Sequence, residues 1–198
     1  MADEHNDYLV AGIAGLVTAL FLMPVLLNLD ALNAFYAIGT FVLIPVLWMA
    51  GILLGRILSK WVRFFAQFSK FAVVGFLNAA IDFGILNGLS LFTGAVSGFI
   101  IGGVNAPGFI IASINSYFWN RLWVFPQTNG EGKFADFPKF ALISILGVIL
   151  NSLVVVYFTT YVHQFGFSDK VWLNAAKAIA SAMVLTWNFV GYKFFAFK

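Results

Sequence analysis

The chain has 198 residues, of which 62% are hydrophobic and 10% are charged, and it contains no cysteine. A soluble domain carries about a quarter charged residues because its surface faces water, so many of these apolar side chains must face lipid. The lack of cysteine excludes disulfides and thiolate metal sites. The net charge of +3 is small, and it fits the charge asymmetry of membrane loops better than a nucleic-acid site. We therefore expect a membrane protein with no metal, no cofactor and no nucleic-acid partner.

Six apolar runs follow one another along the chain, and each has about the 20 residues that cross the hydrocarbon core of a bilayer. They are expected at residues 8–27, 34–58, 71–92, 96–118, 140–163 and 171–195. Pro107 lies in the fourth run, and we expect a broken turn there because proline removes a helical hydrogen bond. The predicted fold class is an all-α membrane protein with six transmembrane helices.

The segment between the second and third runs, residues 59–70, carries cations and aromatic side chains on opposite sides of a helix. Lys60, Arg63 and Lys70 recur at helical spacing, and Trp61 lies on the other side. Such a helix rests at the membrane surface, with its rings at headgroup depth and its cations near lipid phosphates. We expect an interfacial amphipathic helix here, and a plain stop signal beside the membrane is the alternative.

The last four runs contain a weak internal repeat. Sliding the chain against itself superposes residues 68–72 on 137–141 and residues 121–125 on 193–197. The third and fifth runs therefore share a beginning, and the fourth and sixth share an ending. Since each helical hairpin returns the chain to the same side, the two hairpins are expected to be parallel and related by a pseudo-twofold axis along the membrane normal. The expected domains are an added N-terminal hairpin at 1–58, the interfacial helix at 59–70 and a four-helix domain at 71–198.

Lys and Arg gather on one side of this six-helix arrangement. Such residues in short loops stay on the cytoplasmic side during insertion. Lys170 falls on the opposite side and Lys177 lies within the sixth run, whereas the other nine share one side. These nine are Arg56, Lys60, Arg63, Lys70, Arg121, Lys133, Lys139, Lys193 and Lys198. We therefore expect a multi-pass protein of the cytoplasmic (inner) membrane with both termini in the cytoplasm.

The repeat also relates polar residues inside the apolar runs. Asp82 corresponds to Asn151, and Asn105 corresponds to Lys177. A charge at the centre of a bilayer costs about 2.5–3.5 kcal/mol on insertion scales, so such side chains face the bundle interior and find partners. We expect an ion pair between Asp82 and Lys177. The pair has two further interpretations, as a simple link between helices or, for Asp82, as a proton-coupling group.

Four cations stand at equivalent positions of the two hairpins, at the predicted cytoplasmic mouth. They are Lys70, Lys139, Arg121 and Lys193. A ring of this kind is suited to gathering phosphate, because charge-assisted hydrogen bonds to phosphate oxygens are strong. The same placement also follows from the positive-inside rule alone.

Motifs over residues 68–198 follow a recognisable order. They start with Gly75-x-x-Asn78-x-x-Ile81-Asp82, then Asn115-x-x-x-Trp119-Asn120-Arg121, and they end with Trp187-Asn188-Phe189-x-x-Tyr192-Lys193. Lys139, Asn151 and Lys177 stand between the last two. In this order they resemble the GtrA-like family of small four-helix membrane proteins, which is similar to the membrane portion of some dolichol-phosphate mannose synthases. The hairpin at 1–58 departs from the family pattern.

The resemblance implies translocation of a polyprenyl-phosphate-linked monosaccharide across the cytoplasmic membrane for cell-surface polysaccharide glycosylation. Such a lipid needs a polar track for its headgroup, whereas its tail stays in the bilayer. Polar faces on four helices would supply this track. The candidate substrate-binding residues are Asn78, Asp82, Asn105, Asn115, Trp119, Asn120, Arg121, Asn151, Lys177, Asn188 and Lys193.

Other functions remain open at this point. The chief alternative is a non-transporting anchor or accessory subunit of a polyprenyl-phosphate glycosyltransferase, and a small-cation exporter is a third. Catalysis is not expected, because the sequence lacks an Asp-x-Asp motif and a Ser/His/Asp set. The partners to consider are the sugar-carrying lipid, membrane lipids, a second copy of the chain and a membrane glycosyltransferase.

Overall fold

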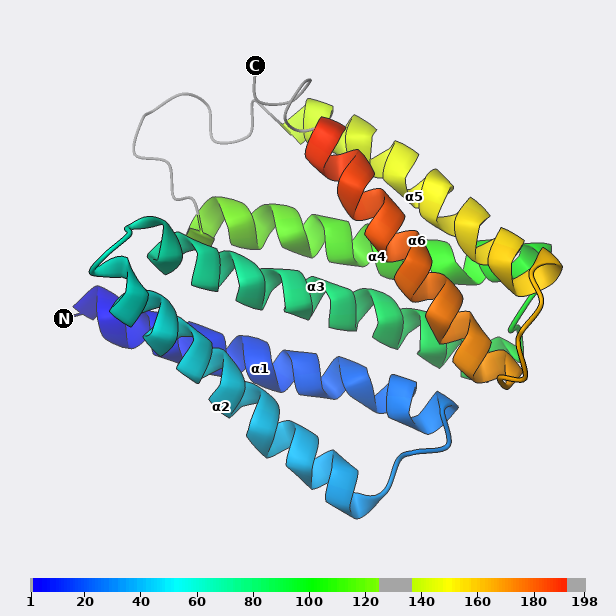
Figure 1. The fold of residues 1–198 in the computed structure, drawn as a ribbon, viewed down its shortest axis with the longest axis horizontal. Helices are drawn as coiled ribbons and strands as arrows, with labels where there is room; N and C mark the ends of the chain where they lie inside the picture. The colour runs from blue at the N-terminus through cyan, green and yellow to red at the C-terminus, as the bar shows by residue number, and fades with distance from the viewer. Residues whose placement is uncertain (1, 125–136, 192–198) are drawn as a thin grey trace.

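The computed structural model describes residues 2–124 and 137–191, and in these ranges the chain forms six α-helices (Figure 1). The helices are α1 (Ala2–Asn28), α2 (Ala34–Ser59), α3 (Phe64–Thr93), α4 (Phe99–Trp119), α5 (Phe137–Tyr161) and α6 (Asp169–Gly191). A short π-helix, η1 (Asn120–Val124), continues α4. The all-α fold class is confirmed.

Five of the helices, α1 to α5, are long and apolar enough to cross a membrane. Helix α6 is more polar, because its sequence includes Asp169, Lys170, Asn174 and Lys177. Lys177 is nevertheless fully buried against the other helices. A helix whose polar residues face protein can still lie among membrane spans, since lipid does not have to solvate those groups.

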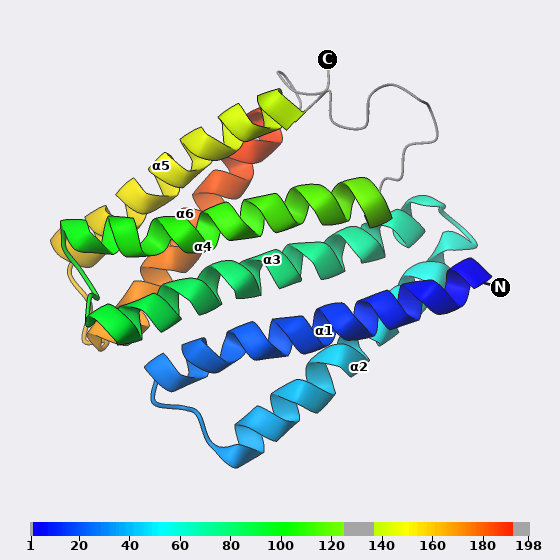
Figure 2. The same ribbon diagram turned by 180° about the vertical axis from the view of Figure 1, so that it is seen from behind.

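The helices pack in an order that runs from the N-terminal hairpin across the molecule (Figures 1 and 2). The hairpin of α1 and α2 packs against α3, and α3 then packs on α4, α4 on α5 and α5 on α6. Among the described residues, the backbones of α3 and α6 approach each other less closely than those of α4 and α5. The seam between α3 and α6 is therefore bridged mainly by side chains.

A glycine allows the added hairpin to lie close to the four-helix part. A Cβ atom at Gly84 of α3 would collide with the backbone carbonyl of Phe21 in α1. The small residue thus lets the two helix backbones approach directly. Two further glycines, Gly94 and Gly98, have φ angles of 70° and 76° and bound the connection from α3 to α4. They end α3 and delay the start of α4 to Phe99, a little after the expected position.

Two expected features take a different form in the structure. The segment at 59–70 is divided, because Ser59 ends α2 and residues 64–70 are the first turns of the continuous helix α3; its place at the membrane surface stays a prediction. The expected break at Pro107 is wrong, since α4 runs through this residue without interruption. Proline removes only one backbone hydrogen bond, and the adjacent Gly108 lies in close contact with Asp82 of α3.

Candidate functional site

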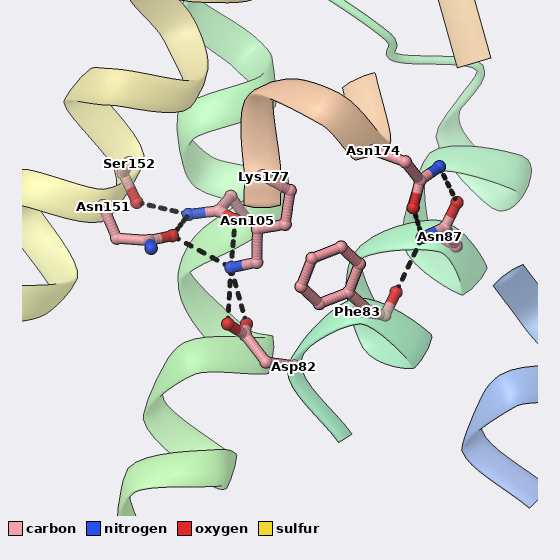
Figure 3. A network of polar contacts seen from close by, with 8 residues as sticks. All are labelled: Asp82, Phe83, Asn87, Asn105, Asn151, Ser152, Asn174 and Lys177. Carbon is pink, nitrogen blue, oxygen red and sulfur yellow. Dashed lines mark hydrogen bonds and ion pairs between the residues drawn. The ribbon is translucent and has the colours of Figure 1, made fainter. Parts of the chain in front are cut away.

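Four polar residues from four different helices meet in the interior of the bundle (Figure 3). The Nζ atom of Lys177 on α6 lies 2.7 Å from both carboxylate oxygens of Asp82 on α3. It also donates to Oδ1 of Asn105 on α4 at 2.7 Å and to Oδ1 of Asn151 on α5 at 2.9 Å. The expected ion pair is present, and two amides complete it. We call these four residues the Lys177 cluster.

The Lys177 cluster is closed in this conformation. The side chain of Lys177 is 0% exposed and that of Asp82 is 9% exposed. Asn105 reinforces the closure, because its Nδ2 atom donates to Asn151 at 2.9 Å and to Ser152 at 3.0 Å. Removing one partner from such a buried pair costs about 3–5 kcal/mol, because the remaining charge is left uncompensated. The cluster therefore ties all four helices together while it is intact.

The members of the Lys177 cluster are the residues that the internal repeat relates to one another. Asp82 and Asn151 occupy equivalent places in α3 and α5, and Asn105 and Lys177 do so in α4 and α6. All of these side chains meet at the ammonium group of Lys177, so the hairpin of α3 and α4 contacts the hairpin of α5 and α6 there. Each hairpin therefore contributes two polar groups to the same interior site.

Two buried polar atoms near the cluster have no hydrogen-bond partner among the described residues. They are Nδ2 of Asn151 and Oγ of Ser181, which lies one helical turn after Lys177. A buried polar atom without a partner costs about 1–3 kcal/mol. Because Asn151 contacts the Lys177 ammonium group, its Nδ2 atom leaves a hydrogen-bond donor unused within the cluster itself.

A second polar network links the added hairpin to α3 and α6 (Figure 3 shows its α3 and α6 part). Asn87 exchanges two hydrogen bonds of 2.9 Å with Asn174 across the seam between α3 and α6. Asn28 of α1 donates to the same Asn87 side chain at 2.8 Å. Three helices thus share one amide group, and the seam is held there by neutral hydrogen bonds.

A third polar group lies between α3 and α4. Asn115 donates to Asn78 at 2.7 Å and accepts from Nε1 of Trp119 at 3.0 Å. Asn120, at the start of η1, donates to the backbone and hydroxyl of Ser116 in the preceding turn. These residues line the part of α4 that leads from the Lys177 cluster towards the predicted cytoplasmic mouth.

At the end of the bundle where the chain begins, the carboxylate of Asp7 in α1 is the shared acceptor for side chains of three other elements. Its carboxylate accepts from Lys70 of α3 at 2.8 Å, from Arg56 of α2 at 3.0 Å and from Nε1 of Trp123 in η1 at 2.9 Å. Lys70 also lies 5.6 Å from the centre of the Trp123 ring. We call Arg56, Lys70 and Trp123 the Asp7 cradle.

The comparison with protein families decides the identity of the larger part of the chain. Residues 70–197 match the family model described as GtrA/DPMS, transmembrane domain. The chain belongs to this family. The matched range includes α3 from residue 70 onward together with α4 to α6, and it leaves α1 and α2 outside. Searches of the curated proteins and of the solved structures found no match. The family is that of membrane proteins related to polyprenyl-phosphate sugars, and the chain is a multi-pass member of it.

The GtrA/DPMS domain brings some of the predicted site residues together and keeps others apart. Asp82, Asn105, Asn151 and Lys177 meet in one cluster, whereas Asn78, Asn115 and Trp119 form a separate group. Of the predicted phosphate-gathering residues, Lys70 pairs with Asp7 and Arg121 is half-buried on η1. Lys193 and the side chains of Lys139 and Asn188 lie outside the described residues.

Several residues that connect the GtrA/DPMS domain to the added hairpin were not predicted. Asn28 and Asn87 are amides within apolar runs, which is a usable signal in the sequence because such groups need partners. Asp7 gives a weaker signal, since it lies in a generally acidic start of the chain. Its link to Trp123 joins distant parts of the sequence, and helical periodicity does not report such contacts.

Proposed function

We propose that this protein translocates a polyprenyl-phosphate-linked monosaccharide across the cytoplasmic membrane, for glycosylation of a cell-surface polysaccharide. The observation that carries the proposal is a fully buried lysine, Lys177, held by one side chain from each of α3, α4 and α5. A buried ion pair contributes little to stability compared with apolar packing. Its presence within membrane-spanning helices therefore favours a role in handling a charged substrate.

The proposed step is an exchange of partners at Lys177. The ammonium group directs its donors to oxygen atoms of Asp82, Asn105 and Asn151, and phosphate oxygens are acceptors of the same kind with their own negative charge. When the phosphate binds Lys177, the Asp82 carboxylate becomes free to accept hydrogen bonds from sugar hydroxyls. The unpartnered Nδ2 atom of Asn151 supplies a further donor. Lys70, Lys139, Arg121 and Lys193 recruit the phosphate at the cytoplasmic mouth.

The seam between α3 and α6 is the route that we assign to the headgroup. Side chains rather than close backbone packing bridge this seam, and the amides of Asn87 and Asn174 are its neutral links. Hydrogen bonds of this kind contribute about 0.5–1.5 kcal/mol each, so they can break and re-form within a transport cycle. The prenyl chain stays in the surrounding lipid while the two hairpins rock about their pseudo-twofold axis.

A second candidate function is that of a non-catalytic membrane anchor for a glycosyltransferase that uses the same lipids. The observation that favours it is the closure of the Lys177 cluster, whose charged side chains are buried and mutually satisfied. A static anchor needs the cluster to stay closed, whereas a translocase needs it to open. Co-purification with a glycosyltransferase, without translocation by the isolated protein, is the result that supports the anchor.

The test is translocation of a fluorescent polyprenyl-phosphate monosaccharide in proteoliposomes containing the purified full chain. Asp82→Asn and Lys177→Met are each expected to slow transfer by at least about tenfold, because the first removes the carboxylate that the phosphate replaces and the second removes the ammonium group that both bind. A factor of ten in rate corresponds to about 1.4 kcal/mol in the activation barrier. The matched controls are Asp30→Asn and Lys170→Met, which make the same chemical changes in an exposed ion pair. Equal transfer by all four variants and the native chain contradicts the proposal.

A further inference from the structure

The Asp7 cradle has the arrangement of an anion-binding site that already holds an anion. Oδ1 of Asp7 accepts from Lys70 and from the indole N–H of Trp123, and Oδ2 accepts from Arg56. The three donors come from α2, α3 and η1, whereas the carboxylate comes from α1. The donors therefore converge on one point from elements other than the one that supplies the anion.

These donors match a phosphate group as well as a carboxylate. Arg and Lys form their strongest hydrogen bonds with phosphate and carboxylate oxygens, and a phosphate offers more oxygens to the same donors. Trp123 is held in place by the π-helix η1 and by the Lys70 cation beside its ring. Irregular π-turns of this kind are frequent at functional sites.

We propose that Arg56, Lys70 and Trp123 form a binding site for the phosphate of a lipid headgroup, and that Asp7 is an internal occupant that this phosphate displaces. Displacement would release α1 from its ties to α2, α3 and η1 at this end of the bundle. The site lies apart from the Lys177 cluster but shares Lys70 with the residues to which the proposed translocation assigns phosphate recruitment, so the inference deepens that proposal and rests on it. Its test measures binding and does not depend on transport.

The surroundings of the cradle favour a lipid headgroup over a free phosphate. The side chains of Asp7, Arg56 and Lys70 are 15%, 23% and 24% exposed, so the site is shielded but accessible. Trp61 in the neighbouring connection from α2 to α3 and Phe64 at the start of α3 are 76% and 59% exposed. Exposed aromatic side chains at the end of membrane spans lie at headgroup depth, which places the cradle where lipid phosphates are found.

A purely structural role for Asp7, as a clasp that fixes α1, makes a different prediction. If Asp7 only fixes α1 to the other helices, its substitution lowers the stability of the protein and leaves phosphate binding unchanged. An internal competitor instead lowers the apparent affinity for the phosphate, since the site is free for only part of the time. Removing the carboxylate must then strengthen phosphate binding while the donors remain.

The experiment measures binding of phosphatidic acid to the purified full chain by native mass spectrometry, with phosphatidylcholine of the same acyl chains as the reference lipid. Asp7→Asn is expected to bind phosphatidic acid about tenfold more tightly than the native chain, because the competing carboxylate is gone. Lys70→Gln is expected to lose the preference for phosphatidic acid. Asp30→Asn is the matched control, since it removes a carboxylate from an ion pair elsewhere, and it is expected to bind as the native chain does.

In a second experiment, inorganic phosphate is added to the protein together with phosphatidic acid. If inorganic phosphate displaces phosphatidic acid at a concentration similar to that of the lipid, the site binds free phosphate, and the assignment to a lipid headgroup is overturned. Equal affinities of native, Asp7→Asn and Asp30→Asn proteins overturn the internal-occupant inference. If Asp7→Asn does not fold, the preference for phosphatidic acid is compared between the native chain and Lys70→Gln to test whether the site exists. Loss of the phosphatidic-acid preference in Lys70→Gln supports the site, and an unchanged preference overturns it.

Discussion

Asp82→Asn and Lys177→Met are each expected to lower the free energy of unfolding by about 3–5 kcal/mol, because each leaves a buried charge without its partner. The double variant is expected to lose much less than the sum of the two, since it leaves neither charge uncompensated. The coupling between the two sites should lie within or above the range of about 0.5–3 kcal/mol that is typical of contacting residues. Chemical unfolding in mixed micelles, applied to all four members of the cycle, gives this coupling.

The exposed pair of Asp30 and Lys170 is the control for this cycle. These two side chains are 77% and 36% exposed, with Nζ 2.9 Å from a carboxylate oxygen. An exposed ion pair contributes about 0–1 kcal/mol, so Asp30→Asn, Lys170→Met and their double variant should unfold much as the native chain does. Additive losses at Asp82 and Lys177 would mean that the two charges do not depend on each other, contrary to the geometry.

Gly108→Ala is expected to disrupt the Lys177 cluster without changing any of its members. A Cβ atom at Gly108 would lie 2.6 Å from the backbone oxygen of Asp82 and 2.9 Å from its Oδ1. A backbone oxygen cannot rotate away as a side chain can, so α3 and α4 must separate. Overpacking of this kind costs about 1–3 kcal/mol, and we expect a lower thermal unfolding midpoint together with slower translocation.

Gly103→Ala is the matched control for this substitution. Gly103 lies in the same helix, and a Cβ atom there would meet nothing within 4 Å. Ala is also the better helix former, so this variant should unfold at or above the native temperature. A Gly108→Ala protein that is as stable and as active as Gly103→Ala would show that the close contact between α3 and α4 is not required.

The fold was largely predictable from the sequence, because long apolar runs report membrane helices directly. The internal repeat is the most specific signal in the sequence, since it relates Asp82 to Asn151 and Asn105 to Lys177. The four side chains that the repeat relates meet around the Lys177 ammonium group. The family match over residues 70–197 includes all four of these residues and confirms the resemblance.

The contacts of the added hairpin were not predictable in the same way. Helical periodicity shows which residues share a face of one helix, but it does not show which helix that face meets. The link from Asp7 to Trp123 and the link from Asn28 to Asn87 both depend on the choice of packing partner. The close contact between Gly108, next to Pro107 in the continuous helix α4, and Asp82 of α3 is likewise a choice of packing partner that periodicity does not report.

If the headgroup passes between α3 and α6, these two helices must separate during transport. The chain has no cysteine, so Asn87→Cys and Asn174→Cys can be combined and bridged by a short, reducible thiol linker across the seam. The bridged protein is expected to translocate no lipid in proteoliposomes, and reduction of the linker is expected to restore the rate of the same sample. Transfer by the bridged protein at the rate of its reduced form would contradict the passage of the headgroup between α3 and α6.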